Sequence, residues 1–232
     1  NGNMYIEWKL FKDLTLKTTN NYEIADGEGR RYWNPKSNYG FVKGYLQAGK
    51  TQYMQVTTSN TLNYQKMFGS HSIQVIGGQE ATKYSANYYF IEAPDVDPAI
   101  PFLNTGTSGS DDADYDEQGY TLESYFGVLY YNYGGKYFLQ GSIRTDGSSR
   151  FGKANRWGTF WSLGASWNMH NETFIKNLGF VNQLKLRASY GLSGNFNIGY
   201  YDHFGLYNSG QYDGMTGISP LQPANPDLGW EN

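Results

Sequence analysis

Hydrophobic and polar positions alternate most regularly over 137–167, on both sides of a connection at 145–156 that is rich in glycine, serine and charged residues. This pattern predicts two antiparallel strands. One face of the pair is apolar and the other is small, polar or charged; the apolar face carries Tyr137, Leu139, Ile143, Trp157, Trp161, Leu163 and Trp167. Such a face packs on a second sheet in a soluble sandwich, or meets lipid in an outer-membrane barrel whose polar face lines the lumen.

The same alternation predicts further strands over about 3–10, 14–24, 51–64, 71–86, 120–133 and 184–190, with the start of another at 228–231. Gly134 and Gly135 form a two-residue turn of the hairpin type. The connection 168–182 is expected to hold one helical turn, with Asn171 as its N-cap. The predicted fold class is therefore all-β and antiparallel.

The predicted connections alternate in length along the chain. Three are long, at about 25–50, 87–119 and 195–226, and those after the first, third, fifth and seventh strands are short or modest. A barrel with short periplasmic turns and long extracellular loops predicts this alternation. A sandwich gives no reason for it, so the pattern favours a barrel. A secreted or surface β-sandwich that binds glycans stays as the alternative.

The composition agrees with a β protein and argues against several classes of function. The 22 tyrosines, 13 phenylalanines, 6 tryptophans and 29 glycines are typical of strands and turns. No apolar run is long enough for a transmembrane helix, and the net charge of -3 gives no basic surface for nucleic acid. There is no cysteine, no HExxH and no GxSxG motif, and no pattern singles out a glycosidase pair among the carboxylates. We therefore expect no enzyme and no cofactor.

Several motifs in the second half of the sequence occur together in a distinctive order. They are YFG at 125–127, YYNY at 130–133, RTDGSSRFG at 144–152, NRWG at 155–158, LKLRASYG at 184–191, GNFNIG at 194–199 and NPDLGWE at 225–231. This succession closely resembles the barrel region of SusC/RagA-like TonB-dependent transporters. Residues 1–119 fit that family by pattern alone, as pairs of strands with variable long connections.

The resemblance implies a large antiparallel transmembrane barrel in the outer membrane of a Bacteroidetes-type bacterium, with an N-terminal plug inside it. Plugged barrels of this kind have about 22 strands. Residues 1–232 would then be a partial barrel domain of about eight strands and the start of a ninth. The abrupt start and end of the sequence also suggest a segment of a longer chain.

The resemblance also implies partners and a solute class. A SusD-like lipoprotein would act as a lid on the extracellular mouth, and pairs of transporter and lid would form a dimer. TonB would act through an N-terminal part that this sequence does not contain. The imported nutrient would be an oligosaccharide or a peptide.

Charged residues cluster around the connection 145–156. We expect Arg144, Asp146, Arg150 and Arg156 to form an ion-pair network at the rim or in the lumen of the barrel. Such a network would fix the geometry of the connection rather than bind substrate.

Aromatic residues in the long connections are the candidate substrate contacts. Their rings could stack on sugar faces, or pack between loops and against a lid. The candidates are Tyr32, Trp33, Tyr39, Tyr200, Tyr201, Tyr207 and Tyr212. Aromatic residues on the strands are expected to form the interfacial belts of the membrane.

An acidic run at 111–117 is a weaker candidate for a metal site. Asp112, Asp114, Asp116 and Glu123 have the spacing of positions 1, 3, 5 and 12 of a calcium-binding loop. Position 6 of such a loop needs glycine, and this sequence has Glu117 there. We therefore expect a solvated or partner-facing loop and no metal.

Overall fold

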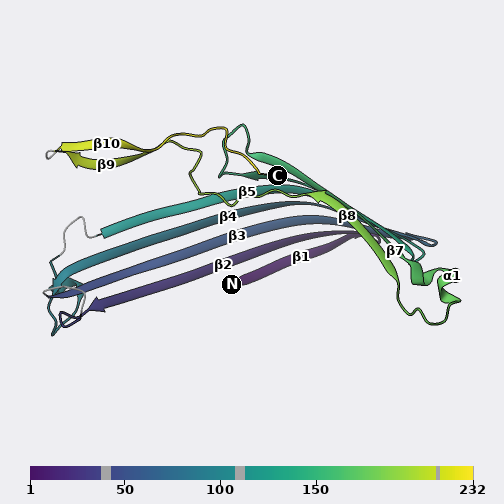
Figure 1. Ribbon diagram of the computed structural model, residues 1–232, viewed down its shortest axis with the longest axis horizontal. Helices are drawn as coiled ribbons and strands as arrows, with labels where there is room; N and C mark the ends of the chain where they lie inside the picture. Colours follow the sequence, from purple (N-terminus) through teal and green to yellow (C-terminus); the bar gives the residue numbers. More distant parts are fainter. Residues whose placement is uncertain (38–42, 108–112, 213–214, 232) are drawn as a thin grey trace. The chain divides into compact units, whose positions relative to one another are not determined.

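The computed structural model describes residues 1–37, 43–107, 113–212 and 215–231 (Figure 1). Eight strands form one sheet in which the strands follow each other in chain order. They are β1 (Gly2–Phe11), β2 (Leu14–Trp33), β3 (Gly44–Phe68), β4 (His71–Val96), β5 (Ala113–Tyr133), β6 (Tyr137–Ser148), β7 (Trp157–Asn168) and β8 (Lys185–Leu192). Pairing of β5 through β8 is antiparallel. The antiparallel all-β fold that was predicted is confirmed.

The register of β5 through β8 confirms the two faces predicted from the alternation. Ile143 lies opposite Trp161, and Leu163 lies opposite Tyr190, on the apolar face. On the other face, the hydroxyl oxygens of Ser142 and Ser162 are 2.7 Å apart. Sandwiches connect their strands as Greek keys, whereas each of these eight strands pairs with its neighbours in sequence. The sandwich alternative therefore does not fit the structure.

Several strands extend beyond the predicted boundaries. β2 continues to Trp33 and β4 to Val96, and β3 begins at Gly44. The segments between strands in this region shorten to 34–43 and 97–112. The sequence pattern missed these extensions because none of them alternates regularly between apolar and polar residues: the end of β2 is rich in glycine and charge, and the end of β4 contains a continuous aromatic run and a proline. Pairing with neighbouring strands holds them in an extended conformation. Whether these connections are extracellular stays a prediction.

The connection after β8 contains an additional hairpin that was predicted as loop. β9 (Leu206–Tyr212) pairs antiparallel with β10 (Met215–Gln222), and the register shifts between Pro220 and Gln222. A hairpin with free edges tolerates proline, because an edge position needs no second hydrogen bond. In the predicted ninth strand, the described residues make one bridge, between Asn195 and Glu231.

Short helical turns complete the described structure. They are η1 (Leu103–Thr105), η3 (Met169–Asn171) and α1 (Thr173–Lys176). The prediction that Asn171 is the N-cap of the helical turn is wrong: the N-cap position is Glu172, and its side chain makes no capping hydrogen bond. Among the described residues, no helix has the length and apolar character that crossing a membrane requires.

The chain divides into two compact units. One comprises residues 1–2, 21–56 and 83–119, and the other comprises 3–20, 57–82 and 120–232. In the first unit, Leu46, Ala93 and Val96 are buried and pack with Tyr32 and Leu103. In the second, the buried residues include Phe151, Ile175, Ser124, Ser148 and Arg150. The candidate site residues of the second half of the sequence therefore belong to one unit.

Candidate functional site

Arg144 is the centre of an ion-pair cluster on the polar face of β6. Its Nε donates to Asp146 Oδ1 at 2.6 Å, and its Nη2 donates to Glu80 Oε1 at 3.0 Å. Nη2 also donates to the hydroxyl of Ser124, a buried residue, at 2.9 Å. The guanidinium group lies 5.6 Å from the centre of the Phe126 ring. One cation thus links three strands, β4, β5 and β6.

The predicted four-residue network is therefore only partly assembled. Arg144 and Asp146 come together because residues two apart in a strand share a face. In the described part of the chain, neither Arg150 nor Arg156 forms an ion pair. The sequence analysis missed Glu80, which lies 64 positions before Arg144. The sequence indicated this ion pair only weakly, because a single acidic residue in a polar strand belongs to no recognisable local pattern.

Arg150 lies in an aromatic cage instead. Only 8% of its surface is exposed, and its guanidinium carbon lies 4.3 Å from the centre of the Tyr120 ring and 4.6 Å from that of Tyr200. The Nη1 atom of Arg150 donates to the carbonyl oxygens of Phe196 and Ile198, at 3.3 and 3.0 Å. Stacked rings and carbonyl dipoles stabilise this buried cation. Arg150 thereby attaches the segment after β8 to Tyr120 in β5.

The segments 148–156 and 225–231 pack together, and we name this pair of segments the clasp. Gly152 N donates to Leu228 O at 3.0 Å, and Asn155 Nδ2 donates to Asp227 O at 2.7 Å. Trp230 Nε1 donates to the carbonyl oxygen of Arg156 at 2.9 Å. The rings of Phe151, Phe160 and Phe196 lie 4.9, 5.1 and 5.8 Å from that of Trp230. Residues from three of the distinctive motifs of the sequence, RTDGSSRFG, NRWG and NPDLGWE, therefore belong to one structural unit.

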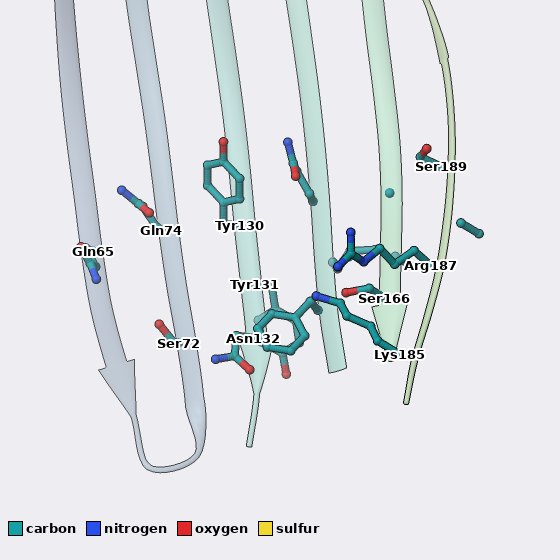
Figure 2. A pocket seen from close by; sticks show the side chains of 16 residues that line it. Gln65, Ser72, Gln74, Tyr130, Tyr131, Asn132, Ser166, Lys185, Arg187 and Ser189 are labelled. Carbon is teal, nitrogen blue, oxygen red and sulfur yellow. The ribbon is translucent and has the colours of Figure 1, made fainter. Parts of the chain in front are cut away.

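A polar groove of about 660 Å³ lies near the short-turn end of strands β3 through β8 (Figure 2). Amides, hydroxyls and two cations line it together with aromatic and aliphatic groups such as Tyr130, Phe138 and Ala188, and none of its described lining residues is acidic. Figure 2 shows Lys185 and Arg187 extending from β8 over the neighbouring strands, with Gln65 and Gln74 on the other side. The Lys185 ammonium group lies 5.3 Å from the centre of the Phe138 ring. This groove offers hydrogen bonds and positive charge on the face opposite the apolar one.

The structure separates the candidate aromatic residues of the connections into packed and exposed ones. Tyr200 packs on Arg150 and Tyr120, Tyr32 packs against the buried core of the first unit, and Trp33 meets Tyr45 edge-on at 5.3 Å. Tyr201 and Tyr207 are exposed, the latter by 69%. Tyr39 lies outside the described residues, and the side chain of Tyr212 is not described.

The acidic run does not assume the geometry of a calcium-binding loop where it is described. Asp114 and Asp116 lie in the extended strand β5, whereas a calcium loop turns sharply at its centre. Asp112 lies outside the described residues. Among the residues that are described, no group of three or more potential ligands is placed to hold a metal ion.

A second charged cluster, which no pattern in the sequence indicated, lies in the turn after β7. The carboxylate of Glu172 accepts hydrogen bonds from Lys136 Nζ at 2.7 Å, from the Tyr137 hydroxyl at 2.7 Å and from Trp167 Nε1 at 3.2 Å. The bond from Lys136 first, and then those from Tyr137 and Trp167, lower the pKa of Glu172 from 4.5 to about 2. Glu172 thus ties the turn between β5 and β6 to the turn after β7.

This pKa predicts how acid affects the turn. Because the folded-state pKa of Glu172 is depressed, its stabilising effect is complete above pH 4.5 and disappears as the pH falls toward 2. We expect the thermal unfolding midpoint of the protein to exceed that of Glu172→Gln above pH 4.5, and the difference to shrink below it. All other acidic groups titrate in both proteins, so the difference isolates Glu172. A difference that stays constant down to pH 2 would contradict the assignment.

Comparison with known proteins identifies the family of this fold. Residues 2–232 match the family described as TonB dependent receptor-like, beta-barrel. A TonB-dependent receptor of Formosa agariphila is 33% identical over 233 residues, which cover 98% of this chain and 22% of that protein. The TonB-dependent receptor SusC of Bacteroides thetaiotaomicron is 33% identical over 248 residues, 99% of this chain and 24% of SusC.

Solved structures give the same result. The RagAB peptide transporter matches with a TM-score of 0.87 and 25% identity over 98% of this chain and 26% of that chain. The RagAB peptide importer in its open-open state matches with a TM-score of 0.87 and 26% identity. The chain spans about a quarter of the length of these relatives. With its antiparallel sheet of eight consecutive strands, the chain belongs to the β-barrel family of TonB-dependent receptors.

Proposed function

We propose that the whole protein imports a nutrient across the outer membrane, and that this chain forms part of its barrel wall. The observation that carries the proposal is the two-faced sheet. Ile143, Trp161 and Leu163 are exposed on one face, where lipid would cover them, and polar side chains occupy the other, where they would line the lumen. The family match supports an outer-membrane location for this wall.

The polar groove suits contact with the plug and with passing solute. Lys185 and Arg187 lie there without an acidic residue among the described lining. Acidic groups of a plug inside the barrel, or of a solute, would complement these two cations. The groove thus lines part of the path of the solute through the barrel. Its position near the short-turn end favours contact with the plug over first recognition of the solute.

First recognition of the solute is assigned to the exposed aromatics of the long connections. Tyr207 and Tyr201 present rings that stack on sugars or on the side chains of a peptide. The nutrient class is an oligosaccharide or a peptide: SusC-like receptors and the RagAB peptide transporter are both similar to this chain. A SusD-like lipoprotein would cover these connections as a lid, TonB would supply the energy, and transporter–lid pairs would associate as dimers.

The role of Tyr207 is tested by removing its ring. We expect Tyr207→Ala to weaken solute binding by about 1–2 kcal/mol, or roughly 5- to 30-fold, because a stacked aromatic face is lost. Tyr207→Phe is the matched control and keeps the ring, so its affinity should stay close to that of the original protein. Binding is measured by isothermal titration of the purified whole transporter with the solute identified in the uptake assay below. Equal affinities of all three proteins would remove Tyr207 from the site.

The transport function is tested in the native bacterium. A strain without the gene is expected to lose growth on one class of nutrient, tested with panels of oligosaccharides and of peptides as sole sources. Loss of TonB should abolish the same uptake, and the transporter extracted in detergent should co-purify with a lipoprotein. Uptake that is unchanged in both mutant strains would refute the proposal.

A further inference from the structure

An aromatic row runs along the apolar face at the short-turn end of β5, β6 and β7. The rings of Tyr133 and Tyr137 are stacked at 6.3 Å, and those of Tyr137 and Trp167 at 6.1 Å. Phe174 in α1 extends the row, with its ring centre 6.5 Å from that of Trp167. These rings share the face of Leu139 and Leu163, because Tyr137 lies opposite Trp167 in the same register. The row is therefore not on the face of the polar groove.

The turn after β7 exposes apolar side chains next to this row. Phe174 is 57% exposed, Leu178 49% and Phe180 77%. Ile175 between them is buried and attaches the segment to the rest of the unit. Exposed apolar side chains that follow one another closely in the sequence mark a surface that contacts a membrane or another protein. Figure 1 places α1 beyond the end of β7.

The polar ends of the row point to a boundary between water and lipid. The Tyr137 hydroxyl and Trp167 Nε1 both donate to Glu172, while their rings stay on the apolar face. Tyrosine and tryptophan take this orientation at membrane interfaces, with an apolar body in lipid and a polar tip toward water. The carboxylate of Glu172 accepts these two hydrogen bonds, which a lipid headgroup or water would otherwise accept. Lys136 neutralises its charge at 2.7 Å, so that a negative charge does not repel anionic headgroups.

We propose that residues 169–184 form a membrane-interface anchor. This inference rests on the proposed barrel wall. The side chains that enter the boundary between the headgroups and the acyl chains, in the phospholipid leaflet at the short-turn rim, are those of Phe174, Leu178 and Phe180. The exposed Lys176 lies among them in sequence and reaches the lipid phosphates. The row that Phe174 extends lies on the opposite face of the sheet from the lumen, which favours lipid over a partner inside the barrel.

The depth of single side chains in lipid tests the proposal directly. This chain contains no cysteine. A single cysteine is introduced into a cysteine-free form of the whole transporter, as Phe174→Cys or Phe180→Cys. It is then labelled with an environment-sensitive nitrobenzoxadiazole group. Leu163→Cys on the apolar face of β7 is the control for the wall, and Lys153→Cys, which replaces an exposed residue of the connection 149–156, is the control for water. The labelled proteins are placed in phosphatidylcholine vesicles with nitroxide groups at acyl carbon 5 or carbon 12. Both Phe174 and Phe180 are exposed, so these labels leave the fold intact; heat-dependent migration in gels verifies this.

We expect the labels at 174 and 180 to be quenched at least threefold more by the nitroxide at carbon 5 than the label at 153. The label at 163 should be quenched more by the nitroxide at carbon 12. If 163 is quenched but 174 and 180 are not, the anchor is refuted while the wall stands; a blue-shifted emission at 180 without lipid quenching would show that protein covers the segment instead. If 163 is not quenched either, the proposed wall itself fails.

Discussion

Gly152→Ala opens the clasp, and the effect is expected to be large. A Cβ atom at this position would overlap the carbonyl oxygen of Pro226, a main-chain atom that no change of rotamer can move. Relief of the overlap requires segments 148–156 and 225–231 to separate, which also breaks the bond from Gly152 N to Leu228 O. Overpacking and the lost hydrogen bond together cost about 3 kcal/mol, or roughly a hundredfold in the closing equilibrium.

Hydrogen exchange followed by mass spectrometry measures this opening in the whole transporter. Peptides that cover 148–156 and 225–231 should lose protection by roughly two orders of magnitude, and the yield of folded barrel should fall. Gly164→Ala is the matched control, because its Cβ would meet Ser189 and Ala188 only at ordinary contact distances of 3.6 and 3.8 Å. Equal protection in Gly152→Ala and the original protein would show that the clasp tolerates a side chain.

Arg150→Ala is expected to release the segment that follows β8. The substitution removes two charge-assisted hydrogen bonds to Phe196 and Ile198 and the contact with the Tyr120 and Tyr200 rings. Part of this loss is offset because a buried cation no longer has to be desolvated. The net effect should be about 3 kcal/mol, which corresponds to roughly a hundredfold faster exchange over 195–204.

Arg150→Lys separates charge from shape. Lysine keeps the cation but lacks the planar group that stacks between rings and donates to two carbonyl oxygens. We expect an intermediate loss of protection in the same peptides, with that of β6 and β7 unchanged in both variants. Protection of 195–204 that survives Arg150→Ala would mean that the rings hold the segment without the cation.

The pairing of β5 through β8 was predictable because alternation with a period of two is a strong signal. The tryptophans of β7 and the leucines of β8 lie on the same face at regular spacing. The ends of β2 and β4 were not predictable, because neither the glycine and charged residues of β2 nor the aromatic run and proline of β4 have such a period. Their extended conformation comes from neighbouring strands, which are distant in sequence.

The candidate site likewise contains features that the sequence predicts and features that it does not. The pair of Arg144 and Asp146 follows from their spacing within one strand, whereas Arg150 belongs to a connection and its partners lie between 30 positions before it and 50 after it. Charge and proximity in the sequence had grouped Arg150 with Arg144 and Asp146. In the structure, rings and carbonyl oxygens stabilise Arg150 in place of a carboxylate. Glu172 was missed because it resembled an ordinary residue of a turn, and its three donors come from the turn before β6, from β6 and from β7.

The consecutive order of the eight strands has a consequence for how such proteins diversify. Since each strand pairs with its neighbour in sequence, a connection can lengthen without any change of partner or register in the wall. The entropic cost of closing a longer flexible connection rises by only about 0.6 kcal/mol for each doubling of its length. Insertions such as the β9–β10 hairpin can therefore accumulate at one end of an inherited wall. New recognition surfaces arise there while the fold keeps its stability.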